Sequence, residues 1–137
     1  MKRKRLSRHV EERLFLVERV ITVPLVHEIG IIENFDVQKR YNDYTPQVYE
    51  CISVDDNIIS GLIENLSIMK TYFQSINRPE LGLDYYGITI IPPESLSLFY
   101  NVVTSSGYFK ISDELSELAS KIIQATKEKK YMIHYGI

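Results

Sequence analysis

The sequence predicts a small α/β or α+β fold in which a three- to four-stranded sheet is packed by about four helices. Three observations support this fold class. One β-branched apolar run ends abruptly at two prolines, and segments with helical spacing of apolar residues alternate with short strand-like runs. In addition, 137 residues with 45% hydrophobic content match the size and composition of one ordinary globular domain.

The clearest element is the strand predicted over residues 86–91. The side chains at 88–91 are all β-branched and none is charged, which is typical of a strand buried on both faces of a sheet. Pro92 and Pro93 cannot donate ladder hydrogen bonds, so the strand must end there. Proline is favoured in the first turn of a helix, and Glu94 suits the positive end of a helix dipole. A helix should therefore follow, and the predicted helices should cover both faces of this strand.

The N-terminal part divides into a flexible basic arm over residues 1–6 and the start of a single domain over residues 7–137. Ser7 is a suitable N-cap. After it, apolar residues recur at helical spacing and predict an amphipathic helix: Val10, Leu14, Val17 and Ile21. A buried strand over residues 14–17 is the alternative for this stretch.

The next segments give weaker periodicity. Residues 25–35 fit either a helix or a short strand, and residues 36–46 are a polar and aromatic loop. Residues 48–54 alternate as in a strand. Asp55 and Asp56 then cap a helix whose apolar residues keep helical spacing to its end: Ile59, Leu62, Ile63, Leu66, Phe73 and Ile76.

The remaining elements surround and follow the central strand. Residues 80–84 form a loop before it, and residues 96–103 carry a helical apolar face after it. A last helix begins at residue 112 or 113, where a serine and an aspartate are good caps. Residues 131–136 then predict a closing strand.

The net charge of −2 hides a marked asymmetry along the chain. Both ends are basic, whereas residues 9–126 contain 8 basic and 17 acidic residues, a net charge of −9. Phosphate is repelled by such a surface, so the charge argues against nucleic acid as the main partner of the folded body and is compatible with a basic protein partner. An acidic surface can also serve solubility alone.

The sequence contains no phosphate-binding glycine loop, and its histidines lack a second ligand at helical spacing. His134 on a closing strand is expected to be packed or hydrogen-bonded. Cys51 would be a nucleophile only if His27 or His134 came close to it, and a small core residue is the simpler interpretation. Asp55 and Asp56 suit helix capping better than metal binding. We therefore expect no enzyme, no cofactor and no metal.

Three features of the sequence favour a cytoplasmic protein without membrane contact. It has a single cysteine, it lacks the apolar core of a signal peptide, and it has no apolar run of the roughly 20 residues that would span a bilayer. Tyrosine is abundant, with ten residues against no tryptophan. Several of these rings lie beside acids, as in Asp84-Tyr85-Tyr86. Tyrosine is enriched at the cores of protein interfaces, and acids around it would steer a basic partner. The alternative is that half or more of these rings fill the edge of the core.

A resemblance is carried by the run Tyr86-Gly87-Ile88-Thr89-Ile90-Ile91-Pro92-Pro93-Glu94-Ser95-Leu96, by the helix pair after it and by the terminal Ile133-His134-Tyr135-Gly136-Ile137. Over residues 85–137 the chain resembles small bacterial immunity proteins. These are the antitoxins encoded beside polymorphic or contact-dependent growth-inhibition toxins. The resemblance implies a cytoplasmic, non-catalytic protein that binds one toxin domain and blocks its active site. If the toxin is a nuclease, that active site would be a basic cleft.

The expected function is thus neutralisation of a cognate toxin through an acidic, tyrosine-bearing surface. The predicted partner-binding residues flank two predicted loops: Asp55, Asp56, Glu64, Glu80, Asp84 and Tyr85. The alternative function is a small regulatory or nucleic-acid-associated protein that acts through the basic arm over residues 1–6.

Overall fold

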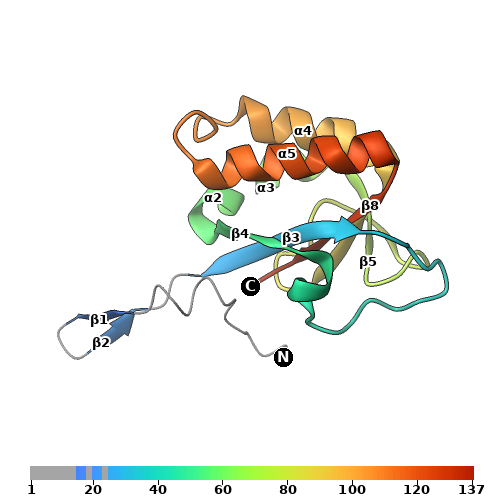
Figure 1. The fold of residues 1–137 in the computed structure, drawn as a ribbon, viewed down its shortest axis with the longest axis horizontal. Coiled ribbons are helices and arrows are strands. Elements are labelled where there is room, and N and C mark those ends of the chain that lie inside the picture. The colour runs from blue at the N-terminus through green and yellow to red at the C-terminus, as the bar shows by residue number, and fades with distance from the viewer. Residues whose placement is uncertain (1–14, 18–19, 23–24) are drawn as a thin grey trace.

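The computed structural model describes residues 15–17, 20–22 and 25–137, and its main element is a six-stranded antiparallel sheet (Figure 1). The strands are β3 (Val26–Ile32), β4 (Ile52–Asp55), β5 (Lys70–Phe73), β6 (Pro79–Leu81), β7 (Ile88–Ile91) and β8 (Tyr131–Tyr135). Their order across the sheet is β4-β3-β8-β7-β5-β6. The fold is α+β, which is one of the two fold classes that the sequence predicts. The sheet, however, has six strands, whereas three or four are expected from the sequence.

The middle of the sheet confirms the strongest sequence signals. All four residues of β7 are buried, as predicted for a strand covered on both faces. After Pro92 the chain forms a short 3-10 helix η2 (Pro93–Ser95) that leads directly into α4 (Leu96–Ser105). The proline pair therefore ends the strand and begins the helical segment, for the physical reasons given above.

Within the described residues, the α-helices all pack on one face of the sheet, here called the helix face (Figure 1). They are α2 (Asp56–Ser60), α3 (Ile63–Leu66), α4 and α5 (Asp113–Glu128). The Ser112 side chain accepts a hydrogen bond from the backbone N–H of Leu115, which confirms the predicted start of α5. Among the buried residues of the core between helices and sheet, Phe99 is the one aromatic residue, and the partly buried rings of Tyr100 and Phe109 pack against its edge.

The opposite face, here called the loop face, has a different cover from the one expected. Residues 33–51, including the 3-10 helix η1 (Pro46–Tyr49), lie over it in place of helices. The core under them is rich in aromatic rings, and Phe35 stacks on Tyr131 with 3.8 Å between ring centroids. Gly30 is required here because a Cβ atom at this position would lie 2.7 Å from the sulfur of Cys51.

The predicted N-terminal helix is wrong where the structure describes it, whereas the alternative of a strand over residues 14–17 agrees in position with a strand of the structure. Two short strands, β1 (Phe15–Val17) and β2 (Val20–Thr22), form an antiparallel pair of their own instead of continuing an amphipathic helix. The β-branched residues at 17, 20, 21 and 22 favour strand over helix. The basic arm over residues 1–6 and the proposed cap Ser7 lie outside the described residues.

Three further boundaries are corrected. The strand expected over residues 48–54 begins only at Ile52, because η1 occupies its first half and Glu50 adopts a left-handed φ of 50°. In place of the one long helix expected after Asp55 there are two short helices, α2 and α3, of which the second ends at Leu66, and β5 follows within the span expected to be helical. The loop expected over residues 80–84 begins as the edge strand β6.

Candidate binding surface

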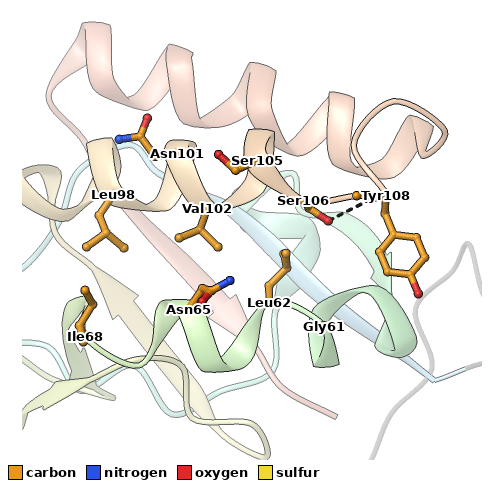
Figure 2. A pocket seen from close by; sticks show the side chains of 11 residues that line it. Gly61, Leu62, Asn65, Ile68, Leu98, Asn101, Val102, Ser105, Ser106 and Tyr108 are labelled. Atoms are coloured by element: carbon orange, nitrogen blue, oxygen red, sulfur yellow. Dashed lines mark hydrogen bonds between the residues drawn. The ribbon is translucent and has the colours of Figure 1, made fainter.

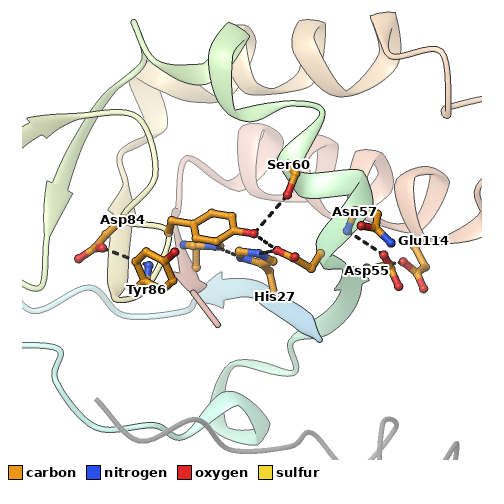
Figure 3. A network of polar contacts seen from close by, with 10 residues as sticks. His27, Asp55, Asn57, Ser60, Asp84, Tyr86 and Glu114 are labelled. Atoms are coloured by element: carbon orange, nitrogen blue, oxygen red, sulfur yellow. Dashed lines mark hydrogen bonds and ion pairs between the residues drawn. The ribbon is translucent and has the colours of Figure 1, made fainter. Parts of the chain in front are cut away.

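A network of polar contacts connects α2 with the sheet (Figure 3), and the carboxylate of Asp56 takes part in two of its contacts. Its Oδ1 atom is 2.9 Å from Nε2 of His27 and also accepts a hydrogen bond from the Tyr85 hydroxyl. That hydroxyl is 3.2 Å from Oγ of Ser60. On the other side of the ring, Nδ1 of His27 is 2.9 Å from Nε2 of His134. Five side chains distant in sequence are therefore linked in one chain of contacts.

The sheet topology places the two histidines, here called the histidine pair, next to each other. Side chains alternate along β3, so His27 shares the helix face with Ile29. Ile29 in turn lies directly opposite His134 on β8. Both histidines have 0% exposed surface, and their rings stack with 5.1 Å between centroids. The edge-to-face contact of Tyr85 at 5.0 Å from His27 brings that tyrosine against the pair.

Residues 84–87, here called the tyrosine turn, are held by hydrogen bonds within the turn and to β7. The backbone N–H of Gly87 donates to the carbonyl of Asp84 at 3.1 Å. The Asp84 carboxylate accepts from the backbone N–H of Tyr86 at 3.3 Å, and the Asp84 N–H donates to the hydroxyl of Thr89 at 2.7 Å. A side chain at Gly87 would collide with the Asp84 carboxylate. This local chemistry fixes the turn in one conformation.

The chain after β8 fixes the same turn from the other side. The N–H of Gly136 donates to the carbonyl of Gly87 at 2.7 Å, and the N–H of Ile137 donates to the carbonyl of Tyr85 at 3.0 Å. Gly136 passes so close that a Cβ atom there would overlap the Tyr85 carbonyl group. The backbone of the tyrosine turn is therefore clamped between β7 and the segment that follows β8.

Tyr86 is the exposed part of this arrangement. Its side chain is 65% exposed, and its ring meets Tyr85 edge to face with 4.9 Å between centroids. Burial, followed by the hydrogen bond to Asp56, raises the pKa of the Tyr85 hydroxyl above its ordinary value. The Tyr85 hydroxyl thus remains a hydrogen-bond donor at neutral pH. The result is an exposed aromatic ring that packs on Tyr85, with the Asp84 carboxylate in the same turn and the Asp56 carboxylate bound to the Tyr85 hydroxyl.

The structure brings together some of the predicted partner-binding residues and separates the others. Asp56 and Tyr85 are hydrogen-bonded, and Asp84 belongs to the same turn. Asp55 caps α2 by accepting from the N–H of Asn57, and its own N–H donates to Glu114 at the far side of the network (Figure 3). The two remaining residues of the predicted set are exposed on other elements: Glu64 on α3 and Glu80 on β6.

Sequence reasoning missed the residues that support the turn, which are His27, His134 and Ser60. It expected His134 to be packed or hydrogen-bonded, and the structure confirms this. Their connection depends on the pairing of β3 with β8, which no local sequence pattern announces. Tyr86 carried a usable signal, because it lies in the Asp84-Tyr85-Tyr86 cluster of acids and rings.

Cys51 lies on the loop face, packed beside Tyr49, whereas the histidine pair lies on the helix face. The sheet therefore separates the thiol from both imidazoles, and a Cys–His nucleophile is not assembled. Burial and then the charge of Glu28 raise the pKa of the Cys51 thiol well above its ordinary value. Among the described residues there is no group of three acidic, cysteine or histidine side chains placed to hold a metal ion.

A groove between α3 and α4 is the other notable surface feature (Figure 2). It has a volume of about 550 Å³ and lies between α3, with its flanking residues, and α4, with the loop that follows α4. Its lining contains no charged side chain: Gly61, Leu62, Asn65, Ile68, Leu98, Asn101, Val102, Ser105, Ser106, Gly107 and Tyr108. The groove is therefore unlike the acidic surface around the tyrosine turn.

Comparison with known proteins gives no match. No protein-family model matches the chain, and no curated protein and no solved structure matches it significantly. In the described part of the chain, every helix is too short or too polar to cross a bilayer.

Proposed function

We propose that the protein is a non-catalytic binding protein that neutralises a cognate toxin domain by masking its active site. The binding surface is the tyrosine turn together with the start of α2. It presents the ring of Tyr86 and the carboxylates of Asp84 and Asp56 to the partner. This surface keeps half of the residues expected from the sequence and adds the exposed tyrosine beside them.

The observation that supports the proposal is an exposed ring packed on a neighbour that is itself held by hydrogen bonds and ring contacts. Tyr86 is 65% exposed, yet it packs on Tyr85, which is fixed by Asp56 and His27. A tyrosine that is ordered before binding loses little conformational entropy on association. Rigid aromatic anchors of this kind carry much of the binding energy at protein interfaces. The geometry therefore suits a protein partner.

Charge supports a basic partner. Residues 9–126 have a net charge of −9, and the turn itself contributes Asp84 with Asp56 beside it. The Asp56 side chain is 20% exposed, so it can face a partner while it holds the network. A complementary charge accelerates encounter and disfavours partners of like charge. The basic substrate cleft of a toxin nuclease would be complementary to such a surface.

The toxin as partner follows from the resemblance of residues 85–137 to bacterial immunity proteins, which includes the tyrosine turn at its start. The test is co-expression with the product of the neighbouring gene, followed by copurification and a growth assay. We expect a stable complex and protection of the cells. A neighbouring product that is toxic but neither copurifies nor is neutralised would rule the proposal out.

Two substitutions locate the surface. Tyr86→Ala should weaken binding about 100-fold if the ring is a central anchor, since such residues are worth about 2–4 kcal/mol. Asp84→Asn keeps the acceptor atom and the shape of the turn, so it should mainly slow association and reduce its salt dependence. Tyr108→Ala is the matched control, because Tyr108 is 46% exposed but lines the groove near α4. Equal losses for both tyrosine variants would place the interface elsewhere.

A further inference from the structure

The histidine pair lies directly beneath the proposed binding surface and is shielded from solvent. Its rings have 0% exposed surface, come from two neighbouring strands and are joined by a 2.9 Å contact between ring nitrogens. Histidine is the side chain whose ordinary titration falls nearest to physiological pH. Because the two buried imidazoles are in direct contact, protonation of one ring changes how readily the other is protonated.

The contacts fix where the protons lie when both rings are neutral. The carboxylate of Asp56 can only accept, so Nε2 of His27 donates to it. A neutral imidazole has one donor and one acceptor nitrogen, so Nδ1 of His27 accepts. Nε2 of His134 must then donate across the 2.9 Å contact. The hydrogen bonds therefore run from His134 to His27 to Asp56, where the Tyr85 hydroxyl also donates.

One added proton fits this arrangement, and two do not. A charged His27 can donate to Asp56 through Nε2 and to His134 through Nδ1, provided that His134 moves its own proton to the other nitrogen. A second proton would place N–H groups of both rings head-on across the same contact. The hydrogen bond is then lost, and two positive charges repel each other in a buried site.

We propose that the histidine pair is a proton-sensitive latch that holds the tyrosine turn against the sheet at neutral pH and releases it when both rings are protonated. Separation of the rings drives His27 against Tyr85, whose ring centroid lies 5.0 Å from that of His27 and whose hydroxyl shares the same Asp56 oxygen. The Tyr85 hydroxyl loses its site and the turn detaches. If the turn is the toxin-binding surface proposed above, acidification then lowers the affinity for the partner.

Several other ionisable groups lie on the elements around the pair and set the background charge. Asp56 and Tyr85 contact it directly. The others are Asp55 at the end of β4, Glu114 on α5, and on the opposite face Glu28, Tyr44, Cys51 and Tyr135. Tyr44 donates to Glu28 across the loop face, so that carboxylate has a hydrogen-bond partner of its own.

The test uses the free protein and two backbone amides that report on the turn. The N–H groups of Gly136 and Ile137 donate to the carbonyls of Gly87 and Tyr85. Hydrogen exchange, corrected for the intrinsic effect of pH, should show their protection falling about tenfold or more between about pH 7.5 and about pH 5. Amides of α5 are the internal control and should keep their protection.

The variant His134→Gln separates a latch from a merely structural residue. The glutamine amide can donate to Nδ1 of His27 but cannot take up a proton, so protection of Gly136 and Ile137 should become independent of pH. An equal loss of protection in this variant would overturn the latch. In the His9→Gln background, imidazole nitrogen shifts report only His27 and His134, and charging of both rings without loss of protection would also overturn it.

The latch and the proposed function can fail separately. The exchange and shift measurements need no partner, so an empty copurification would end the toxin proposal and leave the latch standing. Where a complex is obtained, its affinity should fall on acidification for the wild type and not for His134→Gln. A complex of pH-independent affinity with a working latch would place the toxin interface away from the tyrosine turn.

Discussion

The two faces of the sheet are covered by different structures and filled by different side chains. The helix face is closed by α4 and α5 over a mainly aliphatic core, whereas the loop face is closed by residues 33–51 over a core rich in aromatic rings. A helix presents a regular stripe of medium-sized side chains, and an irregular loop does not. Large rings can reach from the sheet to an irregular cover. The type of cover thus determines which residues the core needs.

This difference also explains the high tyrosine content. Six of the ten tyrosines belong to the aromatic core of the loop face: Tyr41, Tyr44, Tyr49, Tyr72, Tyr131 and Tyr135. Their abundance therefore supports the alternative interpretation, in which most rings fill the core edge. The tyrosines that remain available for a partner are few, and Tyr86 is the most exposed of the ten.

The largest effect is expected on the helix face. Phe99 is 0% exposed in the core under α4, so Phe99→Ala should lower the free energy of unfolding by about 3–5 kcal/mol. Urea denaturation measures it. The control is Leu98→Ala on the same helix, where the side chain lines the groove and the loss should be much smaller. Equal losses would mean that the groove side is as tightly packed as the core.

A smaller effect is expected on the loop face. Phe35 is only half-buried, and its main contact is the stack on Tyr131. Phe35→Ala should cost about 2 kcal/mol, because only part of a full ring burial is lost. Hydrogen exchange should increase over residues 33–51 and remain unchanged in α5. Uniform loosening of both faces would show that the loop cover is not a separate unit.

Alkaline pH should act on the loop face through Cys51. Its pKa is raised in the folded state, so above about pH 9 the unfolded chain loses the thiol proton while the folded chain keeps it. Stability should therefore fall with rising pH, by up to about 1.4 kcal/mol per pH unit for this group. Cys51→Ala should have a shallower slope between about pH 9 and about pH 10. Identical slopes would assign the loss to other groups, such as Tyr135.

The smallest effect is expected away from both cores. Lys130 pairs with Glu33 and Glu128 at the surface, and both acids are exposed. Surface ion pairs contribute little because water and salt screen them. Lys130→Ala should therefore leave the thermal midpoint unchanged within error at physiological salt. A clear drop would show that the start of the loop cover is anchored through this lysine.

The parts of the fold that the sequence predicts correctly are those with local signals. The prolines after β7, the Ser112 cap and the apolar stripe of α5 depend on neighbouring residues only. The segment after Leu66 was assigned to a helix because its apolar residues keep helical spacing. Tertiary pairing overrides that pattern, since Tyr72 and Phe73 pair with β7.

The candidate surface follows the same division. Asp56, Asp84 and Tyr85 could be selected from composition and from predicted loops. The contact between His27 and His134 spans 107 positions in sequence and exists only because β3 pairs with β8. Glu64 and Glu80 were grouped with the others by proximity in sequence, which does not specify proximity in space.

The position of β8 has a consequence for synthesis in the cell. This strand is the last along the described chain, yet it lies between β3 and β7, and both pair with it. A ribosome must therefore deliver residues 131–135 before the sheet can close. Until then the nascent chain exposes two apolar strands without their shared neighbour, which makes it a client for chaperones. Premature termination before residue 131 should yield an insoluble product rather than a partly active one.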